Sequence, residues 1–221
     1  MNNKLQKFHI WLTKNCPTYL SMVANGSNAT GDALIKGRSD QDILLIFSRW
    51  PFEDLDKIGN YLKKSSFSDE YYFIPFCKDN FLRCHNSSHD FSRKFRTKTL
   101  FGPDFVSKVK LPNKKQTFVL YSRGLNDLAS GLERRLLNAN FWSERNVRNV
   151  FWKIFKEAFM NLQIKFYYET GKYPRTRKEL VEKSKSPILA NALSVFNEIN
   201  TAKKKDVVKA GEKLLQYLGS L

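Results

Sequence analysis

The pattern of apolar and polar residues changes about halfway along this 221-residue chain. The first half contains short apolar runs separated by polar turns, and several of these runs are rich in β-branched and aromatic residues, as strands are. In the second half, apolar residues recur every three or four positions, which is the spacing of amphipathic helices. We therefore expect an α+β fold in which a mixed sheet with flanking helices is followed by an all-α helical bundle.

The first half is predicted to hold two helices and at least three strands. Residues 86–90 are predicted to be a polar loop, and the sequence TLFGPD at 99–104 an edge strand that reverses at Gly102 and Pro103. The other predicted elements are a helix over 2–15, a strand over 18–24, a buried strand over 43–47, a helix over 55–62 and a strand over 71–77.

The second half is predicted to be a bundle of about four or five helices. Thr176 is expected to cap one of them, because Glu179 follows three residues later and completes the pattern of a capping box. The sequence KVKLPNKK at 108–115 has the composition of a linker between domains. We therefore predict one domain at 1–110 and a helical bundle domain at 115–221.

Composition excludes several classes of protein. The chain is 42% hydrophobic and 14% aromatic, which argues against wholesale disorder. No apolar run approaches the roughly 20 residues that span a bilayer, and the N-terminus is too polar for a signal peptide, so we expect a cytoplasmic protein without a membrane partner. The cysteines are odd in number and lack metal-type spacing, so they are interpreted as reduced thiols: Cys16, Cys77 and Cys84.

The charge balance is strongly basic. Lysine and arginine number 38 against 21 acidic residues, a formal net charge of +17. Residues 1–110 carry 17 basic and 11 acidic side chains, whereas 111–221 carry 21 and 10. Such a field attracts polyanions, so nucleic acid is a natural partner; solubility or nucleotide binding alone is the alternative explanation.

The candidate chemistry lies between Gly26 and Phe47, in a glycine-containing loop followed by an acidic pair and an apolar strand. Glycines allow backbone conformations in which consecutive N–H groups turn toward an anion such as phosphate. Asp40 and Asp42 are two positions apart, so on a strand both carboxylates leave the same face and can share Mg²⁺. The stretch therefore predicts a phosphate loop beside a metal site.

This stretch resembles the nucleotidyltransferase superfamily that includes DNA polymerase β, kanamycin nucleotidyltransferase and the minimal nucleotidyltransferases. The family pattern is roughly Gly-Ser-x-Ala-x-Gly, a variable insert, Ser-Asp-x-Asp and an apolar strand. All seven specified positions are matched here, by Gly26, Ser27, Ala29, Gly31, Ser39, Asp40 and Asp42.

The resemblance implies transfer of a nucleoside monophosphate from an NTP, with ATP expected, to a hydroxyl acceptor. It implies that Asp40 and Asp42 are catalytic and bind two Mg²⁺ ions. It also implies that Gly26, Ser27 and Ser39 bind the nucleotide. Arg38, in the variable insert, is an outer candidate for nucleotide binding through the charge of the phosphates.

The chain departs from the family at the third carboxylate, which many relatives carry on the neighbouring strand. That position falls on Tyr72 here, and Glu70 lies two residues earlier, on the same strand face. Glu70 is therefore the candidate catalytic base.

The acceptor and the oligomeric state stay open at this point. The basic charge disfavours a cationic aminoglycoside and suits a tRNA end or a hydroxyl of a partner protein. The alternatives are a catalytically degenerate nucleotide- or RNA-binding module and an antibiotic nucleotidyltransferase. A homodimer is one of the oligomeric states that the sequence allows.

Overall fold

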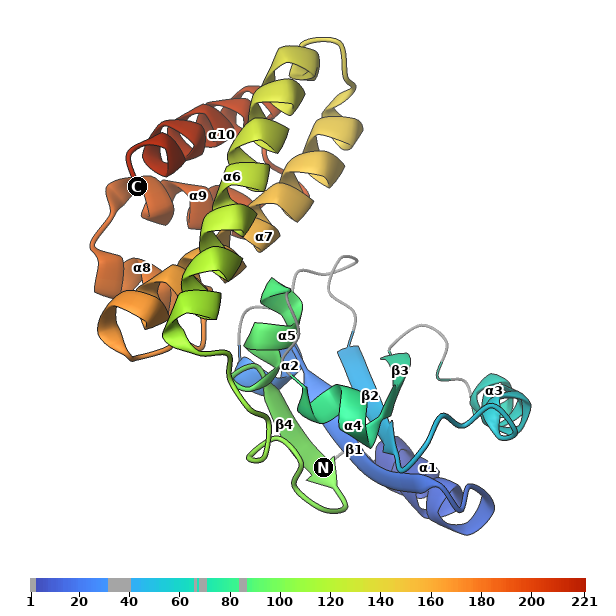
Figure 1. Ribbon diagram of the computed structural model, residues 1–221. Helices are drawn as coiled ribbons and strands as arrows, with labels where there is room; N and C mark the ends of the chain where they lie inside the picture. The colour runs from blue at the N-terminus through green and yellow to red at the C-terminus, as the bar shows by residue number, and fades with distance from the viewer. Residues whose placement is uncertain (1–2, 32–40, 66, 68–70, 84–86) are drawn as a thin grey trace. The chain divides into compact units, whose positions relative to one another are not determined.

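The computed structural model describes residues 3–31, 41–65, 67, 71–83 and 87–221 of the chain, with only the backbone at 27 and 28 (Figure 1). The chain forms two compact units. Unit 1 comprises Met1–His85 and Arg93–Leu111, and unit 2 comprises Asn86–Ser92 and Pro112–Leu221. The segment Asn86–Ser92 thus groups with the helical unit, whereas the boundaries predicted from the sequence placed it in the first domain.

Unit 1 is built on a four-stranded mixed sheet with strand order β3-β2-β1-β4 (Figure 1). Strand β2 runs parallel to β3, while β1 runs antiparallel to both β2 and β4. The predicted α+β class, a mixed sheet with flanking helices, is confirmed. The elements around this sheet are α1 (Asn3–Asn15), β1 (Tyr19–Asn25), α2 (Ser27–Thr30), β2 (Gln41–Phe47), α3 (Leu55–Lys64), β3 (Tyr71–Cys77), α4 (Lys78–Leu82) and β4 (Thr97–Phe101).

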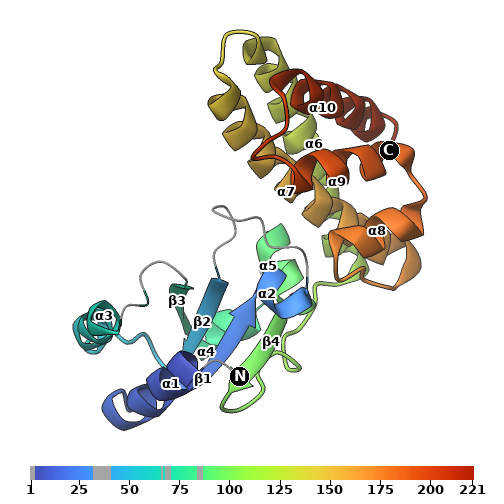
Figure 2. The same cartoon turned by 180° about the vertical axis from the view of Figure 1, so that it is seen from behind.

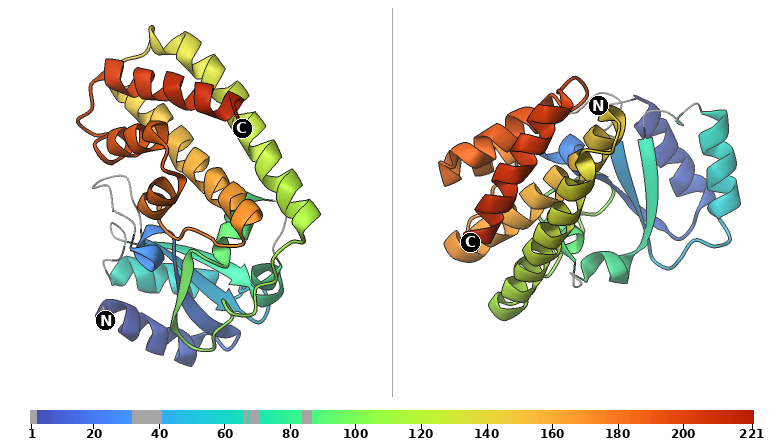
Figure 3. Two further views of the ribbon diagram at one scale, coloured as in Figure 1. Left: turned by 90° about the vertical axis from the view of Figure 1, so that its left-hand side faces the viewer. Right: turned by 90° about the horizontal axis from the view of Figure 1, so that it is seen from above.

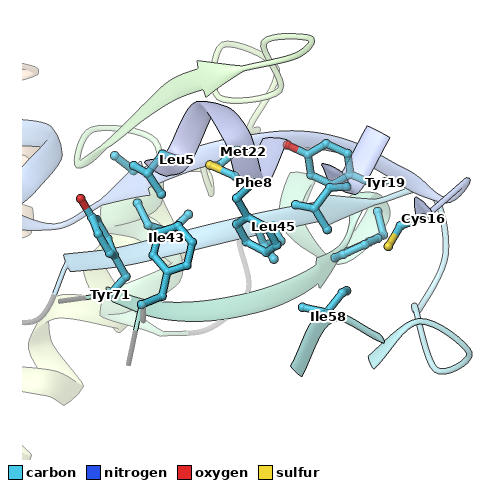
Figure 4. Close-up of a cluster of buried hydrophobic side chains, with 13 residues drawn as sticks. Leu5, Phe8, Cys16, Tyr19, Met22, Ile43, Leu45, Ile58 and Tyr71 are labelled. Carbon is cyan, nitrogen blue, oxygen red and sulfur yellow. The ribbon is translucent and has the colours of Figure 1, made fainter. Parts of the chain in front are cut away.

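Helices α1 and α3 cover one face of this sheet, where the larger apolar cluster lies (Figure 4). The helical spacing of Leu5, Phe8 and Leu12 puts all three on the buried side of α1. They pack against alternate residues of β2, among them Ile43 and Leu45. This alternation fixes the faces of β2: its odd-numbered residues point toward α1, so Asp42 leaves the opposite face.

The opposite face of the sheet packs against α4. Its cluster joins Val23 of β1 and Leu44 and Ile46 of β2 to Phe81 of α4. Phe81 is fully buried, which anchors this short helix although five residues are too few for a stable isolated helix. Asp42 therefore continues the row of Leu44 and Ile46 along β2 and leaves the face of the sheet that packs against α4.

Unit 2 contains five helices within 112–221, all of which the structure describes (Figure 2). Thr176 caps the helix that follows it, as predicted, by accepting a hydrogen bond from the Glu179 N–H, although the Glu179 carboxylate accepts from the Arg175 N–H. Asn113, which was not predicted as a cap, forms a reciprocal capping box with Gln116. The predicted helical bundle is thus confirmed. Its helices are α6 (Lys114–Ala139), α7 (Glu144–Thr170), α8 (Arg177–Ser184), α9 (Pro187–Asn197) and α10 (Lys204–Gly219).

The predicted polar loop at 86–90 is wrong where the structure describes it, because helix α5 (Ser88–Arg93) begins inside it. Ser87 caps this helix by accepting a hydrogen bond from the Asp90 N–H. Long-range packing stabilises it: the ring of Phe91 is fully buried and lies against Tyr167 of α7, with ring centroids 5.5 Å apart.

The long helices of the second unit have the length of a transmembrane segment but a charged composition. Helices α6 and α7 have 26 and 27 residues and are the longest helices of the helical unit (Figure 3). Both carry charged residues throughout, and no described helix is long and apolar enough to cross a membrane.

Candidate functional site

The glycine that opens the predicted phosphate loop has a conformation that favours glycine. Gly26 follows β1 directly and has φ of +67°. Its carbonyl accepts hydrogen bonds from Ala29 N–H at 3.1 Å and Thr30 N–H at 3.2 Å, which close the single turn of α2. The Gly26 N–H donates to the Arg96 carbonyl at 2.9 Å. Gly26 therefore turns the chain from strand into helix, and its own N–H is bound within the protein.

Asp42 lies directly against this turn. A Cβ atom built on Gly26 would be 4.0 Å from Asp42 Oδ2, so the missing side chain leaves room beside the carboxylate. Asp42 is half-buried near the start of β2, where the sheet meets the loop. The structure thus brings together two of the residues selected from the sequence, although 16 positions separate them in the chain.

A row of polar side chains crosses the sheet at the level of Asp42. In the parallel β2–β3 pair, Asp42 is in register with Tyr72. In the antiparallel β1–β4 pair, Asn25 is in register with Thr97. Residues in register project from the same face of a sheet, so Tyr72 stands beside Asp42.

Two basic residues that precede β4, Arg93 and Lys94, make hydrogen bonds within the protein. The Arg93 guanidinium is buried, packs over the rings of Phe76 and Phe81, and donates to the carbonyls of Asn80 and Phe81. Lys94 Nζ donates to the Val106 carbonyl at 3.2 Å and also to that of Ser107. Both side chains are therefore held by backbone carbonyls of the protein itself.

Several predicted site residues lie outside the part of the chain that the structure describes. They are Arg38, Ser39, Asp40 and Glu70, while Ser27 is described by its backbone only, as the first residue of α2. Among the described residues, no group of three or more His, Cys, Asp or Glu side chains could hold a metal ion.

The chain matches solved structures but neither family profiles nor curated sequences. No protein-family profile matches the chain, and no curated protein matches its sequence. A solved structure does match: spectinomycin adenyltransferase AAD(9) from Enterococcus faecialis, determined with ATP and spectinomycin. The match covers 98% of this chain and 97% of that chain, with a TM-score of 0.53 and 14% sequence identity. The chain has a nucleotidyltransferase fold.

Within this nucleotidyltransferase fold, sequence reasoning missed the residues that fix the loop rather than those expected to do chemistry. The Arg96 carbonyl holds the Gly26 N–H across 70 positions of sequence. Every type of residue carries a backbone carbonyl, so the identity of the residue at position 96 gives no sign of this contact in the sequence. Asn25 and Thr97 are likewise ordinary strand residues until the register of the sheet is known.

Proposed function

We propose that this protein transfers a nucleoside monophosphate from an NTP, with ATP expected, to a hydroxyl acceptor and releases pyrophosphate. The observation that carries the proposal is the Asp42 carboxylate beside the positive-φ turn at Gly26, where β1 ends and β2 begins in a nucleotidyltransferase fold. A glycine turn can expose N–H groups to a phosphate, and an adjacent carboxylate can hold the cation that accompanies it.

The residues present fit Mg²⁺. Asp42 offers the hard carboxylate oxygens that this ion prefers, and the missing Cβ of Gly26 leaves space beside them. Asp40 and Asp42 would hold two ions, and Mg²⁺ when bound neutralises charge on the phosphates and activates the attacking hydroxyl. Since the Gly26 N–H is bound to Arg96, we assign the phosphate contacts to the N–H groups that begin α2, at Ser27 and Asn28, which precede the first intrahelical donor, Ala29.

Proton removal is assigned to Glu70. Tyr72 stands at the register position beside Asp42, so a carboxylate base would have to come from another residue, and Glu70 is two residues earlier in the sequence. Ser39 and Arg38 are proposed to contact the nucleotide phosphates from the segment before Asp40.

The acceptor is proposed to be anionic or neutral rather than cationic. The structural neighbour is named for its action on spectinomycin, but residues 111–221 of this chain carry 21 basic and 10 acidic side chains. A field of this sign repels a cationic antibiotic and attracts a polyanion. A tRNA end is therefore the first candidate and a hydroxyl of a partner protein the second.

A second candidate function is a nucleotide- or RNA-binding module without transfer activity. The observation that favours it is the register of Tyr72 with Asp42, which puts a phenol where many relatives carry an acid. The two functions share the nucleotide site and differ only in turnover.

The test is calorimetric titration of Mg-ATP followed by a transfer assay. We expect the double variant Asp40→Asn, Asp42→Asn to bind Mg-ATP at least about tenfold more weakly, because a loss of roughly 1.4 kcal/mol is a tenfold change in affinity. Asp56→Asn is the matched control: it removes one carboxylate from the exposed side of α3 and should bind normally. Unchanged affinity in the double variant would show that the metal assignment is wrong.

The transfer assay supplies ATP, GTP, CTP or UTP labelled at the α-phosphate, Mg²⁺ and tRNA or cell lysate. We expect label on one acceptor class, and loss of transfer in Glu70→Gln if that residue removes the proton. Transfer that is indifferent to Glu70 would assign activation of the hydroxyl to the metal ions. Binding of Mg-ATP without any transfer would establish the second candidate function.

A further inference from the structure

We propose that Tyr72 is itself an acceptor, so that the protein transfers one nucleotidyl group to its own phenolic oxygen. The inference rests on the proposed function, since it uses the same nucleotide site. It adds an acceptor within the chain to the two proposed above, a tRNA end and a hydroxyl of a partner protein.

The position of Tyr72 carries the inference. Its strand is parallel to β2 and in register, and neighbouring strands lie about 4.8 Å apart, so the side chains of Asp42 and Tyr72 leave the same face side by side. Strand β3 is at the edge of the sheet, and Tyr72 is 62% exposed. A nucleophilic hydroxyl on a side chain with two rotatable torsions therefore stands next to the carboxylate proposed to hold the nucleotide's cation.

Nearby hydroxyl groups are less suited to the role. Thr97, in the same polar row, donates its hydroxyl to the Arg93 carbonyl at 2.5 Å. Tyr71, the preceding residue of β3, points to the other face and packs into the apolar cluster with Ile43 and Leu45 (Figure 4). Tyr72, in contrast, is exposed and lies on the same face of the sheet as Asp42.

The step balances without any further reactant. The phenolic oxygen of Tyr72 forms a bond to the α-phosphorus of the NTP, and the bond from that phosphorus to the bridging oxygen of the β-phosphate breaks. Pyrophosphate leaves, and the phenolic proton passes to the solvent that reaches this exposed side chain. The product is a phosphodiester between Tyr72 and the nucleoside. Its negative charge beside Asp42 disfavours binding of another NTP, so the modification stops at one group per chain.

The experiment measures modification of the full-length protein in two ways. Intact mass spectrometry of the protein as isolated, before any nucleotide is added, should show a fraction carrying one nucleotidyl group. Incubation with Mg²⁺ and ATP labelled at the α-phosphate should then raise that fraction, with peptide mapping placing the label on Tyr72. The variant Tyr72→Phe should lose at least about 90% of the label, a tenfold change, while binding Mg-ATP like the wild type by calorimetry.

Tyr71→Phe is the matched control, because it removes the neighbouring hydroxyl from the buried face and should leave labelling intact. Label at another residue, or label that survives in Tyr72→Phe, would overturn the inference. So would unlabelled protein that still binds Mg-ATP, and the proposed nucleotide site would then stand alone. Failure of the wild type to bind Mg-ATP would overturn both the inference and the proposed function.

Discussion

At the scale of the residue, Asp104 shows how one exposed carboxylate organises a turn. Its Oδ1 atom accepts hydrogen bonds from Thr99 Oγ1 and Val106 N–H, each at 2.9 Å, and from Ser107 N–H at 3.3 Å. The turn also requires Gly102, which has φ of +81° and where a Cβ atom would lie only 2.4 Å from the Leu20 carbonyl oxygen. The sequence predicted a reversal at this glycine, and the structure shows why other residues do not fit.

The pKa of Asp104 leads to a prediction about acid stability. Slight desolvation raises this pKa, but the hydrogen bonds from Thr99, Ser107 and Val106 outweigh that effect and hold the pKa below its ordinary value of 3.8. The group therefore adds stability that is complete above the pKa of the unfolded chain and is lost as pH falls through the lower folded value. We expect Asp104→Asn to reduce the free energy of unfolding at pH 7 by roughly 1 kcal/mol.

Urea unfolding at pH 7 and at about pH 3 measures this effect, because the gap between the two proteins should shrink as the wild-type carboxylate is protonated. Asp56→Asn serves as the control, since its carboxylate is exposed on α3. A gap that widens on acidification would contradict the assignment.

At the scale of the element, two helix glycines have opposite surroundings. Gly211 lies on the buried side of α10, and a Cβ atom there would come within 2.4 Å of the Phe151 ring of α7. Gly59 lies in α3, and nothing stands within 4 Å of where its Cβ would be. The first glycine permits close packing of two helices, whereas the second only weakens its own helix.

Alanine at these two positions should therefore change stability in opposite directions. We expect Gly59→Ala to stabilise by up to about 1 kcal/mol, since alanine favours helix over glycine by that amount. Gly211→Ala should instead destabilise by roughly 1–3 kcal/mol, because the methyl group overpacks a fully buried ring. Chemical unfolding of both variants checks this; a stabilised Gly211→Ala would show that α10 can move away from Phe151 without cost.

The sequence predicts elements well where their signal is local. The apolar run Ile43–Phe47 identified strand β2, and helical spacing identified the long helices of unit 2. Strand β2 begins two residues earlier than predicted because Gln41 pairs with Tyr71 of β3, a contact between distant segments. Helices α4 and α5 have five and six residues, too few to show a period, and they depend on burial of their aromatic residues.

The same division applies to the candidate site. Residue spacing in the motif was enough to select Gly26 and Asp42, which the structure brings together. It could not reveal that Arg96 occupies the Gly26 N–H, which moves the proposed phosphate contacts into the start of α2. The sequence thus identifies side chains that belong to a motif, but it does not identify the hydrogen-bond partners of backbone groups.

At the scale of the whole molecule, the distribution of charge predicts binding to RNA. Residues 111–221 carry 21 basic and 10 acidic side chains and so contribute +11 of the net charge of +17, and neutralising several phosphates releases counterions. We expect tRNA binding whose affinity falls by at least about tenfold between roughly 50 and 200 mM salt. Filter binding over this range measures the slope.

Charge reversal should locate the surface responsible. Lys205→Glu with Lys209→Glu changes two exposed residues of α10, and Lys63→Glu with Lys64→Glu makes the same change in charge on α3. The α10 pair should weaken binding more and reduce the salt slope. Absence of tRNA binding at low salt, or equal effects of both pairs, would contradict a surface on the helical unit.

Both units of the chain are discontinuous in sequence, which limits how they can be separated into fragments or recombined. Because Asn86–Ser92 belongs to the helical unit while the residues on both sides belong to the sheet unit, the backbone passes between the units three times. No single cut in the gene separates them, since a break at 111 leaves Phe91 on one fragment and its partner Tyr167 on the other. Neither unit can therefore be exchanged as one continuous segment. Recombination that exchanges a whole unit must exchange two separate stretches of sequence together.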